Sequence, residues 1–245
     1  MDAAWLEPIR AYCERHDAAF WGEPLNAVSN GAFLLAGLAA GLRERRGAVR
    51  DPAARALAAL VLVVGLGSFL FHTLAVRWAM LADVIPIAVF INAYFFLAMR
   101  RFLGLGGAGA LAATIAFAGF AAGLSPLIDA ATGLSSARLS NGSVDYLPAA
   151  LALSGVAGAL LIPPKICAPP KTYPLTSARR AAGRSLLGIA GLFLASLACR
   201  TLDQALCAGL PTGTHFLWHA LNAGVLYGLI ETARRFRLRA ARPPH

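Results

Sequence analysis

Seven long apolar stretches divide this chain of 245 residues, and they constrain its fold more than any other feature of the sequence. They lie near residues 27–42, 56–75, 82–99, 106–124, 144–162, 185–200 and 214–231. A helix needs about 20 mostly apolar residues to cross the roughly 30 Å of hydrocarbon in a bilayer. Each stretch is therefore expected to be a transmembrane helix, although the first and the sixth are short.

The composition also indicates a membrane protein rather than a soluble domain. Hydrophobic residues make up 58% of the chain and charged residues only 14%, and the mean hydropathy is +0.63. A backbone in lipid must satisfy its own hydrogen bonds, and these stretches are far longer than barrel strands and lack their alternation. We therefore expect an all-α fold, a bundle of seven transmembrane helices that forms one integral membrane domain over residues 1–245.

The net charge of +10 suggests nucleic acid at first, but the distribution of the charges indicates topology instead. Most of the 22 Lys and Arg residues lie in the connections after the first, third and fifth stretches and in the C-terminal tail. By the positive-inside rule, the N-terminal segment 1–26 is extracytoplasmic and the tail 232–245 is cytoplasmic. The basic face is expected to contact anionic lipid headgroups, and neither nucleic acid nor a protein partner is expected.

The four cysteines form no CxxC pair. Cys167 falls on the cytoplasmic side and should stay reduced. Cys199 and Cys207 are able to pair with each other or with Cys13, but burial as small apolar side chains is favoured. The proline-rich stretch from Pro163 to Arg184 is expected to be an extended loop.

Two polar motifs interrupt the apolar stretches. Ser68 and His72 lie near the end of the second stretch, Asp83 opens the third, and His215 and His219 open the seventh. Ionisable groups are costly inside a bilayer and are therefore usually functional. Because the second stretch runs outward and the other two begin outside, His72, Asp83, His215 and His219 are expected at the same extracytoplasmic depth, with Ser68 one turn below His72. Residues four apart share a helix face, so each pair can point into the bundle.

This convergence predicts a catalytic zinc site. The imidazoles of His72, His215 and His219 match the three protein ligands of such sites, which keep a fourth position for water. Asp83 and Ser68 are left for proton transfer and hydrogen bonding. Each residue alone has a plainer explanation, since histidines bond to neighbouring helices, serine bonds to its own helix and aspartate caps helices. A haem held by two histidines is another metal hypothesis, but it suits the pattern less well.

The motifs resemble those of the alkaline ceramidase family, whose members are seven-helix membrane hydrolases related to the adiponectin and progestin receptors and to Per1-like proteins. The segments that carry the resemblance read GSFLFHTLAVRWAMLAD, THFLWHALN and, ahead of the first helix, FWGEPLNAVSN. The resemblance implies zinc on His72, His215 and His219, with Ser68 and Asp83 near the metal-bound water. It also implies the same topology that the charge distribution indicates.

The activity implied by the resemblance is hydrolysis of the amide bond of ceramide or a related N-acyl lipid, which gives a fatty acid and a sphingoid-type base. Zinc would activate water and polarise the carbonyl. Asp83 would accept the water proton and pass it to the departing amine, and Ser68 would donate to the oxyanion. We expect Trp218 and Tyr146 to line the substrate pocket, although Trp218 would also suit an aromatic belt. The Ala- and Arg-rich composition suggests a bacterial source, so the protein is expected in the inner membrane. The topology places the active site on the extracytoplasmic side.

The resemblance further implies a calcium site in the N-terminal segment. Glu14 and Glu23 match positions of that site, Asp17 is an additional candidate, and calcium favours clustered carboxylates. Ala11 stands where another acidic residue is expected, and solvated or helix-capping acids explain the pattern equally well. Two other functions stay open: a ligand-binding receptor with a structural zinc, and a transporter or haem-bearing electron carrier.

Overall fold

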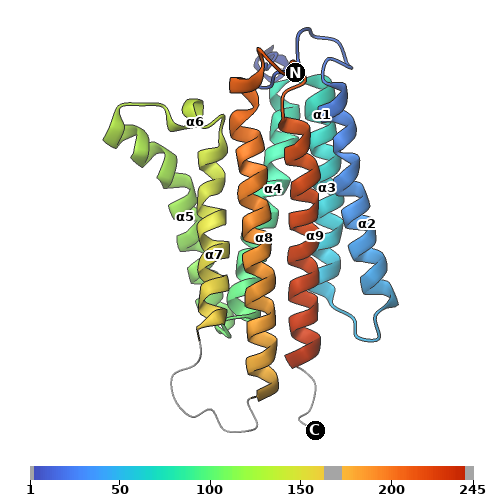
Figure 1. The fold of residues 1–245 in the computed structure, drawn as a ribbon, viewed down its shortest axis with the longest axis vertical. Coiled ribbons are helices and arrows are strands. Elements are labelled where there is room, and N and C mark those ends of the chain that lie inside the picture. Colours follow the sequence, from blue (N-terminus) through green and yellow to red (C-terminus); the bar gives the residue numbers. More distant parts are fainter. Residues whose placement is uncertain (1–2, 163–172, 241–245) are drawn as a thin grey trace.

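The computed structural model describes residues 3–162 and 173–240 of the chain. Over these residues the fold is all-helical, apart from an isolated β-bridge between Pro8 and Val76. The long helices lie side by side along the longest axis of the molecule (Figure 1). The N-terminal segment lies at one end of this bundle, and the last helix finishes at the other (Figure 1).

The helices in chain order are η1 (Ala3–Leu6), α1 (Pro24–Ser29), α2 (Gly31–Arg46), α3 (Pro52–Leu74), α4 (Arg77–Arg101), α5 (Gly107–Thr132), α6 (Ser136–Leu139), η2 (Ser143–Tyr146), α7 (Leu147–Leu161), α8 (Tyr173–Leu206) and α9 (His215–Ala240). Within the described residues, 6 helical spans are long and apolar enough to cross a membrane. They are Pro24–Arg46, Pro52–Leu74, Arg77–Arg101, Gly107–Thr132, Ser143–Leu161 and Thr176–Leu206. The chain is therefore a multi-pass membrane protein.

The last helix, α9, is long enough to cross a membrane but is not among these six spans. It carries polar residues along its length, namely His215, His219, Asn222 and Glu231. It packs closely against α8 and also contacts α2 and α3 (Figure 1). A seventh crossing and the orientation of the two termini therefore stay predictions.

Several helices extend beyond the expected ranges. The first span begins at Pro24 rather than at residue 27, and α5 continues through Pro126 to Thr132. The stretch expected to be an extended loop up to Arg184 is helical from Tyr173 onward, while residues 163–172, including Cys167, lie outside the described residues. The expected tail is also helical as far as Ala240. Apolar character underestimates these helices because long basic side chains let a helix continue into the headgroup layer.

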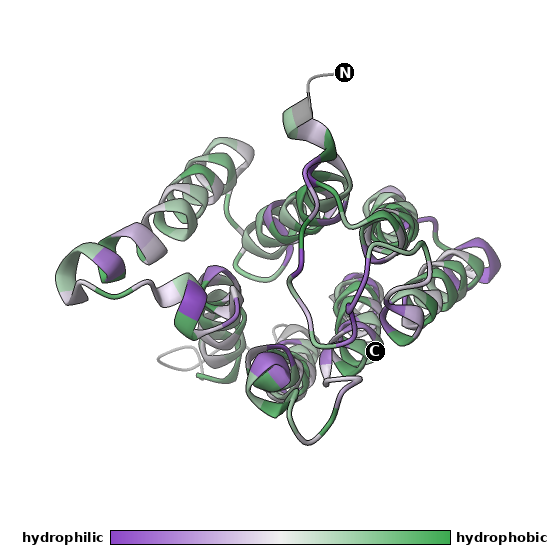
Figure 2. Cartoon of the chain, turned by 90° about the horizontal axis from the view of Figure 1, so that it is seen from above, coloured by the Kyte–Doolittle hydropathy of each residue, from purple (hydrophilic) through white to green (hydrophobic). Residues whose placement is uncertain are grey.

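The helices differ in how far they are buried. In the apolar 18-residue part of α3, 56% is buried inside the protein, whereas in the corresponding part of α5 only 6% is buried. Figure 1 shows α5 leaning away from the bundle toward the end that carries α6. Outward-facing side chains such as Leu35, Ile115 and Leu127 are 64–71% exposed, and hydrophobic colour covers most of the helices in Figure 2. Such an apolar surface is suited to lipid rather than to water.

Candidate metal centre

Three histidines meet at the end of the bundle that carries the N-terminal segment. His72 lies in the last turn of α3, while His215 and His219 lie in the first turns of α9. Their side chains are buried, and one ligating atom of each lies within 4.8 Å of those of the other two. The structure thus brings together the three histidines that the sequence suggested as ligands.

Hydrogen bonds orient two of these rings. His72 Nδ1 lies 2.6 Å from Glu23 Oε2, and His219 Nδ1 lies 2.7 Å from the hydroxyl of Ser29 in α1. Two other ring nitrogens, His72 Nε2 and His215 Nδ1, are buried and have no hydrogen-bond partner in the described part of the chain. Buried nitrogens without partners are costly, and outer contacts of this kind commonly orient metal-binding histidines. The three side chains could therefore hold a metal ion.

The start of α9 is fixed by a buried carboxylate from the end of α8. Asp203 Oδ1 accepts hydrogen bonds from the backbone N–H groups of Thr214 and His215 at 2.7 and 2.9 Å. Gly213 has a φ of 62°, and a Cβ at this position would collide with Asp203. Asp203 therefore caps α9 and sets the position of His215. The sequence analysis did not identify this role.

Ser68 and Asp83 lie next to the histidines, where α3 and α4 approach each other closely. A Cβ at Gly67 would collide with the backbone carbonyl of Ala82, so glycine is needed for this approach. Asp83 is buried and interacts electrostatically with Ser68 and His72, and its Oδ1 has no hydrogen-bond partner among the described residues. A carboxylate oxygen is therefore available beside the three imidazoles.

The N-terminal segment covers this cluster. The Tyr12 ring stacks on the His215 ring with 3.5 Å between their centres, and burial raises the pKa of the Tyr12 phenol. A disulfide joins Cys13 to Cys207 just beyond α8, and Cys199 is a free thiol. The expectation that burial as small apolar residues prevails was therefore wrong for Cys13 and Cys207. Spacing alone does not reveal such a pairing, because it depends on where the N-terminal segment folds.

The three acidic residues considered for calcium, Glu14, Asp17 and Glu23, all accept hydrogen bonds from the protein itself. Both carboxylate oxygens of Glu14 accept backbone N–H groups at the start of α1, from Leu25 and Asn26. Asp17 is exposed and accepts the backbone N–H of Ala19. Calcium needs several free oxygen ligands that point at one position. Glu14 and Asp17 instead stabilise the backbone around them.

Arg15 lies among the oxygen atoms that a calcium ion would need. Its Nε donates to Glu23 Oε1 at 2.5 Å, and its Nη1 donates to the carbonyls of Asp17 and Ala19 at 3.3 Å. Its Nη2 donates to the carbonyl of His72 at 2.8 Å. Although burial alone would raise the pKa of Glu23, hydrogen bonds from His72 and Arg15 hold it below its usual range. Glu23 therefore orients His72, and its surroundings do not fit calcium.

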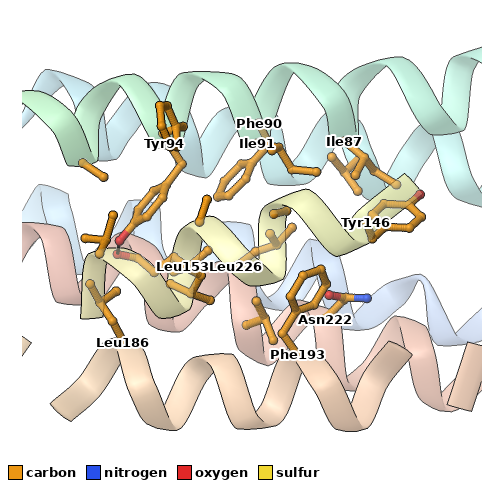
Figure 3. A pocket seen from close by; sticks show the side chains of 18 of the residues that line it. Ile87, Phe90, Ile91, Tyr94, Tyr146, Leu153, Leu186, Phe193, Asn222 and Leu226 are labelled. Carbon is orange, nitrogen blue, oxygen red and sulfur yellow. Dashed lines mark hydrogen bonds between the residues drawn. The ribbon is translucent and has the colours of Figure 1, made fainter. Parts of the chain in front are cut away.

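An apolar cavity lies inside the bundle beside the histidine cluster: Phe33, whose ring contacts that of His219, and Trp218 are among its lining residues. Side chains from α4, α7, α8 and α9 surround it, with Tyr146 and Asn222 toward one end and Tyr94 and Leu186 toward the other (Figure 3). The lining on α9 runs from Trp218 to Leu229, which corresponds to roughly 16 Å of helix. The cavity lining is therefore apolar along about three turns of α9.

The two aromatic residues expected at a substrate pocket do line this cavity. The rings of Tyr146 and Trp218 pack edge to face with their centres 5.0 Å apart. Trp218 directly precedes His219, so these rings lie at the end of the cavity next to the histidines. Asn222, one turn further along α9, has an unpartnered Nδ2 facing this region within the described structure. The sequence analysis gave Asn222 no role, although its spacing from Trp218 places both on one helix face.

Comparison with known proteins adds no assignment: no protein-family model matches the chain, and no curated protein matches it either. The chemistry of the site must therefore be inferred from its own residues. These residues provide three imidazoles that fit one metal ion, a buried carboxylate with an unpaired oxygen, and an adjoining apolar cavity. This combination makes the region the candidate functional site of the molecule.

Proposed function

We propose that this protein is a zinc-dependent hydrolase of N-acyl lipids of the alkaline ceramidase type. The observation that carries the proposal is the convergence of His72, His215 and His219, with buried unpaired nitrogens, at the head of an apolar cavity. Catalytic zinc sites commonly use three protein ligands. The cavity would take the acyl chain and hold the amide bond of the substrate beside the three imidazoles.

The residues around the histidines have separate roles in this mechanism. Zinc held by the three imidazoles would supply Lewis acidity, which activates water and polarises the amide carbonyl. Asp83 would accept the proton of the attacking water and deliver it to the departing amine nitrogen. Ser68 would donate a hydrogen bond to the developing oxyanion. Glu23 and Ser29 would hold two of the imidazoles in position through their Nδ1 atoms.

The substrate would reach the site from within the membrane. The peripheral helix α5 has little of its surface covered by other helices, and it lies beside α4 and α7, which line the cavity. A lipid could therefore enter sideways between helices, with its amide at the level of Tyr146 and Trp218. This route would not require the acyl chain to pass through water.

The proposed orientation has the N-terminus outside, the C-terminus in the cytoplasm and α9 as the seventh crossing. The distribution of basic residues supports it, because Arg45, Arg100 and Arg234 lie at the end of the bundle opposite the histidines. The disulfide between Cys13 and Cys207 also supports it, since disulfides persist in oxidising compartments. The site would then face the extracytoplasmic side of a bacterial inner membrane.

Purified protein tests the proposal through metal content and hydrolysis. We expect about one zinc per chain and release of fatty acid from ceramide, measured by elemental analysis and mass spectrometry. His72→Ala, His215→Ala and His219→Ala should each lose both zinc and activity, because two imidazoles hold zinc far more weakly than three. His16→Ala is the matched control, since His16 is exposed. Full zinc content in all three variants contradicts the metal site, and zinc without hydrolysis of any N-acyl lipid would favour a receptor.

A further inference from the structure

Arg200 places a positive charge inside the site without a carboxylate partner. It lies near the end of α8, and no acidic side chain of the described residues forms an ion pair with it. Its Nη1 donates to the hydroxyl of Tyr12 at 2.8 Å, but its Nε is buried and has no partner among those residues. Part of the guanidinium's hydrogen-bonding capacity is therefore unused.

Three aromatic rings surround this guanidinium. The Arg200 Cζ atom lies 5.6, 5.5 and 5.4 Å from the ring centres of Tyr12, Tyr146 and Trp218, respectively. Aromatic faces stabilise a cation but accept no directed hydrogen bond in its plane. The rings therefore hold the guanidinium in position while leaving its N–H groups available to a planar or tetrahedral anion.

The same rings connect Arg200 to the rest of the site. Tyr12 stacks on His215, so one aromatic ring separates the guanidinium from the histidine cluster. Tyr146 and Trp218 line the apolar cavity. A molecule whose acyl chain fills the cavity and whose amide reaches the histidines would bring the next few atoms of its headgroup to Arg200.

Two other arginines that are buried or partly buried have carboxylate partners, whereas Arg179 donates to backbone carbonyls. Arg15 pairs with Glu23, and Arg101 pairs with Asp51 at 2.8 Å. Removing a guanidinium from water without a counter-ion is costly, so a buried arginine normally has one. Asp83 interacts with Arg200 only as a more distant charge. We therefore expect the counter-ion of Arg200 to be part of a bound ligand.

We propose that Arg200 binds an anionic group of the substrate, a few bonds from the amide nitrogen, and that the site selects anionic N-acyl amphiphiles over neutral ceramide. This inference rests on the proposed function, which places an acyl chain in the cavity and an amide at the histidines. A carboxylate and a phosphate share the required chemistry, because both accept paired hydrogen bonds from a guanidinium. Arg200 acts in binding and takes no part in proton transfer.

Binding of three matched amphiphiles to the zinc-free protein in neutral detergent tests the inference. N-lauroylethanolamine is neutral, N-lauroylglycine carries a carboxylate, and N-lauroylphosphoethanolamine carries a phosphate on the same acyl chain. At least one anionic ligand should bind about 10- to 100-fold more tightly than the neutral one, as expected for hydrogen bonds to a charged group. The preferred anion identifies the headgroup chemistry.

Arg200→Gln should bring the anionic ligands to the affinity of the neutral one, with little change for the neutral ligand. Arg77→Gln is the matched control, because Arg77 is exposed at the same end of the bundle and its loss changes the net charge equally. Arg200→Lys keeps the charge and should retain part of the preference, which separates binding from a purely structural role.

Equal affinities of the wild-type protein for all three ligands would overturn the inference, even if Arg200→Gln failed to fold. An anion preference that persists in Arg200→Gln would overturn it as well. Hydrolysis is measured separately with zinc present. Selective binding of an anion without hydrolysis would refute the proposed enzyme activity and leave the role of Arg200 intact.

Discussion

The two ends of the helical bundle differ in how many of their charged and polar side chains have partners. At the end away from the histidines, Asp51 pairs with Arg101 and Arg237, and Glu231 pairs with Arg234 and Arg235. At the histidine end, polar atoms that lack partners among the described residues face a common region: His72 Nε2, His215 Nδ1, Asp83 Oδ1 and Arg200 Nε. The end away from the histidines therefore has most of its charges in ion pairs, although Glu44 Oε2 has no partner among the described residues. The histidine end also contains the ion pair between Arg15 and Glu23, but several of its polar atoms are unpaired.

This difference predicts which substitutions should lower the stability of the fold and which should lower the activity. Removing one member of a buried ion pair leaves its partner uncompensated and destabilises the fold. Removing a group that is already unpaired has a smaller structural cost, while its loss from a site affects the chemistry. Substitutions at the two ends should therefore give opposite effects on unfolding and on turnover.

The largest effect on turnover is expected for Asp83→Asn. This change keeps the shape of the side chain and removes its basic group, so hydrolysis should fall by about 10² to 10⁴ while zinc content stays near wild type. Kinetics with elemental analysis of the same sample provide the measurement. Asp145→Asn is the control, because Asp145 is exposed at the same end. Loss of zinc in Asp83→Asn would mean that the aspartate anchors the metal site instead.

At the opposite end, Asp51→Ala should destabilise the protein by about 3 kcal/mol, because Arg101 would lose its carboxylate and α3 would lose its N-terminal cap. Denaturant unfolding in detergent measures this loss, and hydrolysis per folded molecule should be unchanged. Arg237→Gln is a graded control, since its side chain is 40% exposed and its pair should contribute less than about 1 kcal/mol. A large loss of turnover in folded Asp51→Ala would contradict the proposal that this end of the bundle affects stability and not activity.

Gly67→Ala should affect both properties, because Gly67 lies where α3 and α4 meet beside the site. The added methyl group would push Ala82 and Asp83 away, with an expected cost of about 1–3 kcal/mol in stability. Displacement of Asp83 should also reduce turnover, by up to about 100-fold. Gly119→Ala on α5 is the matched control, since its Cβ would meet nothing within 4 Å. Wild-type behaviour of Gly67→Ala would refute the close approach of the two helices.

The smallest effect concerns pH. Burial alone would raise the pKa of Asp51, but the hydrogen bonds from Arg101 hold it below its ordinary value of 3.8. A carboxyl group whose pKa is lower in the folded protein stabilises it above the unfolded pKa, and this contribution is lost as the pH falls through the folded pKa. Thermal unfolding should therefore show the stability difference between wild type and Asp51→Asn shrinking below about pH 4. A difference that stays constant down to pH 2 would contradict this role of Asp51.

Much of the helical framework followed from the apolar stretches, and its deviations have physical causes. All seven expected stretches coincide with helices of the described structure, but α9 combines the length of a span with several polar residues. Its burial against neighbouring helices offsets that polarity, and such packing cannot be derived from one stretch alone. Helix ends were missed where Pro24, Pro126 or basic residues occur, because these are compatible with helix in context.

The site was predicted where regular spacing determines geometry. His215 and His219 share one face of α9 because they are four residues apart, and Ser68 and His72 do so on α3. The contributions of Tyr12, Arg15 and Glu23 were not predicted, because the irregular N-terminal segment has no periodicity that places its side chains. The sequence analysis gave Arg200 no role. Its contacts depend on where three separate parts of the chain meet.

The disulfide between Cys13 and Cys207 also sets an order for assembly. These cysteines are 194 residues apart, so most of the chain must be synthesised before the bond can form. Until α8 is complete, the N-terminal segment is joined to the bundle only through α1, and Tyr12 cannot yet stack on His215, which follows α8 in the chain. The three histidines and the segment that covers them can therefore come together only late in synthesis, after the start of α9 has been made.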